Sequence, residues 1–217
     1  MSRQSTLLYG GGKYYEGLRW YGGRWYASDA LKGMVFTIDE SGEREDLASF
    51  EGLCSGLGQL PDGSILAVSM LDRTLQRITA DGHVSQYADL SEVCSSWAND
   101  MIVDAKGRAW VGQIGFAIHE GAAPEPTTIL RVDIDGSVHV AADGLWCPNG
   151  MVVTADGNTL IIAESFAARL TAFTITASGE LTDRRVFAQF GTPPEPGPAE
   201  QMLSSLEVAP DGLAIDS

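Results

Sequence analysis

Basic side chains are scarce in this chain of 217 residues. It has 14 Lys and Arg against 29 Asp and Glu, which gives a net charge of −15 at pH 7 with neutral histidine. Proteins that bind nucleic acid cluster Lys and Arg to neutralise phosphates, whereas no more than two basic residues are adjacent here. We therefore expect neither a nucleic-acid partner nor an anionic membrane surface as partner.

Long apolar runs are also missing. None approaches the roughly 20 residues that a membrane-spanning helix needs. The first 12 residues contain a single Arg3 and no apolar core of the length found in signal peptides. Hydrophobic residues make up 44% of the chain and charged residues 20%, which is typical of a globular protein. The sequence predicts a cytoplasmic protein.

Cysteine is rare, and its spacing excludes the usual thiolate sites. Cys54, Cys94 and Cys147 are far apart and form no Cys-x-x-Cys pair, so a cysteine-ligated zinc or a redox disulfide is disfavoured. We expect reduced, buried thiols. Glycine, by contrast, is abundant, with 25 residues, or roughly 12% against a usual share of about 7%. Many tight turns are therefore expected.

The turns recur at regular positions. Asn99 begins the run NDMIVDAKG-RAWVG, Asn149 begins NGMVVTADG-NTLII, and Ser55 begins SGLGQLPDG-SILAV. A looser copy begins at Glu16 and a fifth copy begins at Asp211. Each complete copy is an apolar run, a glycine turn and a second apolar run, which is the pattern of a β-hairpin.

Two further strands follow each complete hairpin. The third strands are expected at 34–39, 74–79, 129–133 and 170–176, and the fourth near 43–48, 83–88, 137–141 and 184–189. Asp-Gly or Ser-Gly turn signals separate them. A recurring four-stranded antiparallel unit is typical of β-propeller blades. A β-sandwich is the rival all-β architecture, although it requires no internal repeat.

The repeat divides one domain, 1–217, into blades. Their approximate bounds are 13–50, 51–93, 94–143 and 144–200, with the start of a fifth blade at 201–217. Closure of the ring removes sheet edges in a propeller. We therefore expect a truncated chain, which stops after four blades and the first strand of the fifth. An open edge favours association, but no motif specifies an oligomer.

Polar residues begin the first strands and should converge near the propeller axis. They are Glu16, Ser55, Asn99, Asn149 and Asp211. Each taken alone could be a turn former, but converging carboxylate and amide oxygens indicate a hard cation such as calcium, which takes 6 to 8 oxygen ligands. The ends of the second strands are expected to hydrogen-bond these residues from outside; they are Asp29, Ser69, Gln113 and Glu164.

A long connection, 114–127, follows the second strand of the third blade. Long loops on a site face often form a lid or a specificity wall. His119 in this loop is either a proton shuttle or a solvated histidine. Trp97 and Trp146 precede inner anchors, and they form either a pocket wall or ordinary packing.

Four motifs together carry a family resemblance. They are EGLRW from Glu16, NDMIVD from Asn99 with the following Gly107-Arg108, PNGM from Pro148, and PDGL from Pro210. In this order they resemble the regucalcin/gluconolactonase family. The resemblance implies a six-bladed propeller with one divalent metal in its central channel, most often calcium, with zinc, magnesium and manganese as alternatives.

The resemblance also implies residue roles and an activity. Glu16, Asn149 and Asp211 would ligate the metal, Asp211 would be the catalytic base, and Asn99 would contact the substrate or a metal-bound water. Trp97 and His119 are assigned to substrate binding. Trp97 stands where the family often has arginine, which favours a less polar lactone or ester over a sugar acid.

These residues lead to three functional hypotheses. The first is a metal-dependent hydrolase that opens a lactone by activated water, with Asp211 as base. The second is a non-catalytic propeller that binds calcium or a small ligand. The third is an inactive fragment of a lactonase.

Overall fold

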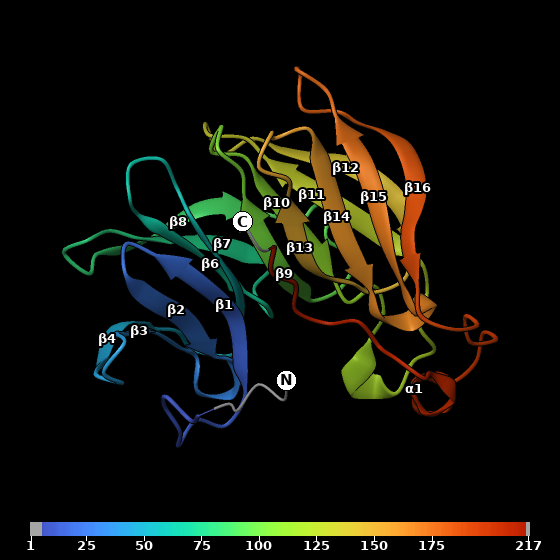
Figure 1. Cartoon of the computed structure of the whole chain (residues 1–217), viewed down its shortest axis with the longest axis horizontal. Helices are drawn as coiled ribbons and strands as arrows, with labels where there is room; N and C mark the ends of the chain where they lie inside the picture. Colours follow the sequence, from blue (N-terminus) through green and yellow to red (C-terminus); the bar gives the residue numbers. More distant parts are fainter. Residues whose placement is uncertain (1–5, 216–217) are drawn as a thin grey trace.

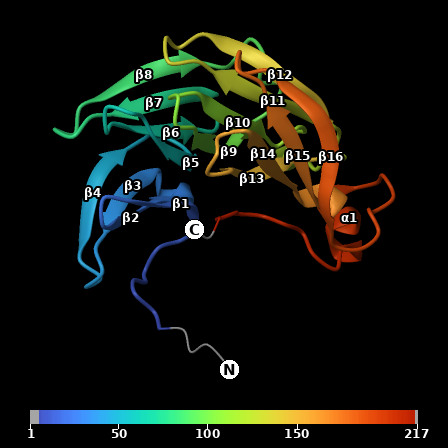
Figure 2. The same cartoon turned by 45° about the horizontal axis from the view of Figure 1, so that its top comes forward.

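The computed structural model describes residues 6–215 and contains four four-stranded antiparallel sheets. Within each sheet the strands lie side by side in chain order. The sheets follow one another as blades around a common axis (Figure 1), and they form an arc with the first strands β1, β5, β9 and β13 on its inner side (Figure 2). The predicted propeller arrangement is thus present in four blades.

The strand bounds follow the predicted repeat closely. The first blade contains β1 (Tyr15–Tyr21), β2 (Arg24–Asp29), β3 (Met34–Ile38) and β4 (Arg44–Ser49). The second contains β5 (Cys54–Gln59), β6 (Ile65–Ser69), β7 (Thr74–Ile78) and β8 (Val84–Asp89). The third contains β9 (Ala98–Val103), β10 (Ala109–Gln113), β11 (Thr127–Val132) and β12 (Val138–Leu145). The fourth contains β13 (Pro148–Val153), β14 (Thr159–Glu164), β15 (Arg169–Ile175) and β16 (Leu181–Gln189).

Short connections explain why the hairpins form where the sequence places them. Between β11 and β12, Gly136 adopts a φ of 84°, a left-handed conformation that costs glycine little. The side chain of Asp135 accepts a hydrogen bond from the backbone N–H of Ser137 over 3.0 Å. This local bond stabilises the tight turn.

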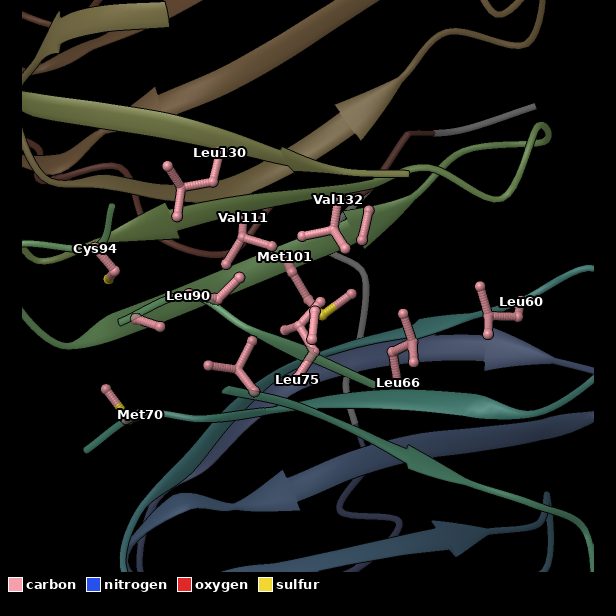
Figure 3. Close-up of a cluster of buried hydrophobic side chains, with 14 residues drawn as sticks. Leu60, Leu66, Met70, Leu75, Leu90, Cys94, Met101, Val111, Leu130 and Val132 are labelled. Carbon is pink, nitrogen blue, oxygen red and sulfur yellow. The ribbon is translucent and has the colours of Figure 1, made fainter. Parts of the chain in front are cut away.

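Apolar faces of neighbouring blades pack together to form the core. Figure 3 shows the cluster between the second and third blades, in which Leu66, Leu75, Met101, Val111 and Leu130 are fully buried. Full burial of such a side chain contributes about 1.5–3 kcal/mol relative to exposure. This packing holds the inner strands in place for the polar residues that begin them.

Three expectations about the fold need correction. β12 continues to Leu145, beyond the expected blade boundary at 143. The fifth blade was expected to begin at 201, but residues there belong to the helix α1 (Ala199–Ser205), whose Met202 side chain is buried. The segment 206–215 is not a strand. It makes a single backbone hydrogen bond to β13, in which Gly150 N–H donates to the carbonyl of Asp211. A β-strand pairing requires a series of such bonds. The rival sandwich is wrong, since the sheets form blades and not two facing layers.

The expected state of the cysteines is confirmed. All three are buried and unbridged, and burial raises the pKa of the Cys94 thiol to about 11 and those of Cys54 and Cys147 to about 12. Within residues 6–215, no helix has the length and apolar character required to cross a bilayer.

Candidate functional site

Glycines next to the polar anchors let the inner strands approach one another. A Cβ atom on Gly17 would lie 2.8 Å from the carbonyl oxygen of Ser55. A Cβ on Gly56 would collide with the backbone of Met101, and one on Gly150 would collide with the backbone of Asp211. Glycine is therefore required after Glu16, Ser55 and Asn149 for this close packing.

Glu16 and Asp211 form the acidic centre of this region. The pKa of Glu16 is raised to about 7, first by burial and then by the negative charges of Asp211 and Asp100, while the Tyr14 hydroxyl and Arg19 oppose the rise. The pKa of Asp211 is raised by burial and by Asp100. Glu16 on β1 and Asp211 beyond α1 thus lie close enough for their charges to interact.

Asn149 completes this group at the start of β13. Its side chain lowers the pKa of the Asp211 carboxyl and partly offsets the effect of burial. The Asn149 amide nitrogen also lies 3.3 Å from the hydroxyl of Ser165, which in turn donates over 2.8 Å to the carbonyl of Pro210. Ser165 therefore fixes both Asn149 and the chain that precedes Asp211.

Asn99 on the third blade and Ser55 on the second blade are buried anchors. They are 6% and 1% exposed. Among the described residues, neither the Asn99 amide nitrogen Nδ2 nor the Ser55 hydroxyl Oγ has a hydrogen-bond partner. Buried polar atoms are normally paired, so these two atoms call for water, an ion or a ligand.

A charged pair beside the site was not predicted from the sequence. Arg19 lies on β1, and its guanidinium Nη2 is 2.9 Å from the Asp100 carboxylate Oδ1. Asp100 directly follows Asn99 and sits within the motif that was singled out. Its position offered a signal, because a buried carboxylate requires a partner. Nothing in the local pattern indicated that the partner would come from another blade.

Trp97 and His119 form a separate structure on the third blade. Their rings stack with centroids 5.1 Å apart and an interplanar angle of 7°. They line a cavity of about 260 Å³ together with Arg73 and Phe116. Glu16 and Asp211 instead line a cavity of about 780 Å³ with an apolar wall. The structure thus brings Trp97 and His119 together, but in a different cavity from the two carboxylates.

The ends of the second strands hold incoming loops and not the anchors, which corrects the expectation. Asp29 accepts hydrogen bonds from the backbone N–H groups of Lys13 and Tyr14 over 3.1 and 3.2 Å. Gln113 and Glu164 accept from the backbone N–H groups of Ser95 and Trp146, over 2.9 and 2.8 Å; the hydroxyl of Ser69 donates to Asp72. The cause is register: Asp29 pairs with Tyr15, Gln113 with Ala98 and Glu164 with Pro148, at the starts of the first strands.

A second apolar cluster covers the chain beside Asn149. Met202 of α1 is 1% exposed and packs with Phe116, Cys147 and Phe166. Phe116 comes from the long 114–127 connection, so this loop contacts α1 through a shared core. Trp146 packs against the same cluster, which favours its packing role. The helix α1 was not predicted, because a seven-residue helix with one buried methionine leaves little periodic signal in the sequence.

The residues present fit a hard divalent cation. Across residues 6–215, no three His, Cys, Asp or Glu side chains gather as a metal-binding cluster. The candidate set instead combines two carboxylates, Glu16 and Asp211, with the amide of Asn149. Oxygen donors of this kind suit calcium, and a cation would offset the burial and the carboxylate repulsion that together raise the pKa of Glu16.

The fold and this site define an all-β protein with propeller blades and an acidic group where the inner strands begin. Residues 15–217 match the family model described as SMP-30/Gluconolactonase/LRE-like region. The chain belongs to this family, and the predicted resemblance is confirmed.

Individual relatives agree with this assignment. The pentonolactonase XacC of Haloferax volcanii is 26% identical over 195 residues, which cover 89% of this chain and 60% of that protein. A gluconolactonase of Xanthomonas campestris superposes with a TM-score of 0.73 at 25% identity and covers 96% of this chain and 69% of that one. Regucalcin of Agrobacterium tumefaciens, a calcium-binding protein, has a TM-score of 0.66 at 23% identity, with 80% and 58% covered. The chain thus spans 60% of the length of the curated relative.

Proposed function

We propose that the protein is a metal-dependent hydrolase that opens lactones or related cyclic esters. The observation that carries this proposal is the convergence of Glu16, Asn149 and Asp211 from the first blade, the fourth blade and the segment beyond α1. Membership of a family that includes lactonases supports it. The substrate is a small molecule.

Glu16, Asn149 and Asp211 would hold the cation. Calcium is the first choice because all three donors are hard oxygens; zinc, magnesium and manganese are the alternatives. When bound, the ion supplies polarisation of the ester carbonyl and acidification of water. The donor set contains two negative charges, which balance a divalent ion.

Asp211 and Asn99 are the residues proposed to act on the substrate. The Asp211 carboxylate would take the proton of the attacking water as general base. The water oxygen bonds to the carbonyl carbon, the ring C–O bond breaks, and the proton held by Asp211 passes to the leaving alkoxide, which gives the hydroxy acid. The unpartnered Nδ2 of Asn99 is a donor available to the developing oxyanion.

A lactone panel with and without chelator tests this proposal. Acid release is followed with a pH indicator for aliphatic and sugar lactones, with wild type and Asp211→Asn compared at equal calcium. Turnover that is lost with EDTA and in Asp211→Asn is the expected result. Chelator-insensitive turnover contradicts the metal, and unchanged turnover in Asp211→Asn contradicts the base.

The calcium-binding relative supports a second candidate, a non-catalytic propeller that binds calcium or a small ligand. Calcium binding without turnover on any lactone of the panel would favour it. An inactive lactonase fragment would give the same result, and turnover by these residues would exclude both. The six-bladed ring and the cytoplasmic location implied above belong to our proposal as well.

A further inference from the structure

A buried ion pair joins two blades that are not consecutive. Arg19 lies on β1 of the first blade and Asp100 on β9 of the third. The Arg19 Nη2 is 2.9 Å from Asp100 Oδ1 and 2.5 Å from the carbonyl oxygen of Met101, and the two side chains are 11% and 3% exposed. Gly56 on β5 makes this reach feasible, since a Cβ there would lie 2.7 Å from Asp100 Oδ1. The pair therefore occupies the space where three inner strands meet.

This pair lies beside the strand that carries the candidate cation ligand Glu16, because Arg19 follows Glu16 on β1. Gly17, the neighbour of Glu16, packs against Ser55 and Gly56, and Gly56 in turn packs against Asp100. After burial, the charge of Asp100 contributes to raising the pKa of both Glu16 and Asp211, and Arg19 lowers that of Glu16. Asp100 is already engaged, because Oδ1 accepts from Arg19 and from the backbone N–H of Met101 over 2.8 Å. A third carboxylate thus stands beside the site while bonded to other groups.

Charge balance suggests what the pair does. Asp100 and Arg19 together are neutral, which leaves the two negative charges of Glu16 and Asp211 to match one divalent cation. Without the guanidinium, three carboxylates would attract a cation more strongly and would repel one another in its absence. We propose that Arg19 is a positioning residue that keeps Asp100 away from the cation and sets the affinity of the site for it. This inference rests on the proposed metal site.

Calorimetric titration with CaCl₂ tests the proposal through a double-mutant cycle of Arg19 and Asp100. Wild type is compared with Arg19→Gln, Asp100→Asn and the double variant Arg19→Gln/Asp100→Asn. Arg19→Gln should bind calcium about tenfold more tightly, and Asp100→Asn about tenfold more weakly because an unpaired guanidinium remains. The double variant restores the charge balance and should bind within about threefold of wild type. Arg24→Gln removes a positive charge at a half-exposed pair with Glu45, and it should leave the affinity unchanged.

A purely structural role for the pair predicts a different order of calcium affinities among the variants. If Arg19 and Asp100 only brace the strands, every variant weakens calcium binding or leaves it unchanged, and this result overturns the proposal. Thermal unfolding without calcium shows whether each variant folds. Should Arg19→Gln fail to fold, weaker binding by Asp100→Asn with recovery in the double variant supports the proposal, and no recovery overturns it. A wild type that binds no divalent cation overturns the metal site and this inference together, whereas a binding wild type with the wrong order overturns this inference alone.

Discussion

The pKa of Glu16 is subject to opposing influences. Burial and two neighbouring carboxylates raise its pKa to about 7, while the Tyr14 hydroxyl and Arg19 oppose that rise. A carboxylate in this position is unfavourable when ionised without a cation and becomes a strong ligand when one is present. The same residue therefore lowers the stability of the cation-free protein and supplies affinity for the ion.

Glu16→Gln separates these two effects. The substitution should weaken calcium binding at least about tenfold, because a neutral amide replaces one of two carboxylate ligands. It should also raise the melting temperature of the calcium-free protein above pH 7, where wild-type Glu16 is ionised. Calorimetry and thermal unfolding in EDTA measure the two quantities. Unchanged calcium affinity would show that Glu16 is only a turn residue.

Asn99 provides a test that distinguishes catalysis from metal binding. Its amide nitrogen is buried without a partner among the described residues, so we assign it to the substrate. Asn99→Ala should lower kcat about 100-fold, as loss of an oxyanion donor does, and should leave calcium affinity within about twofold. Lactone kinetics and calorimetry on the same preparation decide the question. An equal loss in both would make Asn99 a metal ligand.

Only some of the contacts at the candidate site could be predicted from the sequence. Glu16 and Asn149 could be predicted to lie near each other because each begins a repeat at the start of an inner strand. Asp211 also begins a repeat motif, although its segment is not a strand. Arg19 lies inside β1, four residues after the strand begins, and it has no repeated counterpart. Its bond to Asp100 depends on the packing of β1, β5 and β9, which periodicity does not encode.

At the scale of elements, the same hydrogen-bonding arrangement recurs in three blades. The last residue of the second strand holds the backbone that enters the first strand, through Asp29, Gln113 and Glu164. The anchor is the second residue of each of these first strands. The hydrogen bond to the incoming backbone therefore helps to position the anchor. Strand positions were predictable from turns and alternation, whereas this bond depends on the register between the first two strands of each blade.

In the first blade, the stabilisation from these hydrogen bonds should depend on pH, because the acceptor is the carboxylate of Asp29. Its side chain is fully buried, and although burial raises its pKa, hydrogen bonds from Tyr14, Lys32 and Lys13 outweigh that effect and hold it below the usual 3.8. Because the folded pKa is lowered, the stabilisation is complete above about pH 4 and is lost as the pH falls through the folded value. Urea unfolding of wild type and Asp29→Asn should differ by about 1–3 kcal/mol at pH 6.

The difference between the two proteins should shrink in acid. It should become small at the lowest pH that still permits folding, because Asp29 is then protonated and resembles asparagine. A difference that is constant from pH 3 to pH 7 would show that the ionised carboxylate contributes nothing. Asp143→Asn, at an exposed position on β12, serves as the control and should not change stability at any pH.

At the scale of the whole molecule, the candidate ligands come from distant parts of the chain. Glu16 belongs to the first blade, Asn149 to the fourth, and Asp211 to the segment that returns from α1 toward β1 (Figure 2). The backbone of that segment is tied to β13 by the bond from Gly150 to Asp211. A cation bound by all three would therefore connect the two ends of the arc.

Calcium should consequently stabilise the entire fold and not one loop. A ligand that binds only the folded state at 100 times its Kd adds about 2.7 kcal/mol to the free energy of unfolding. We expect saturating calcium to raise the melting temperature, EDTA to reverse the shift, and Glu16→Gln to abolish most of it. Hydrogen exchange should slow both in β1 and in residues 206–215, although they are far apart in sequence. Protection confined to one of these segments would mean that the ion does not bridge them.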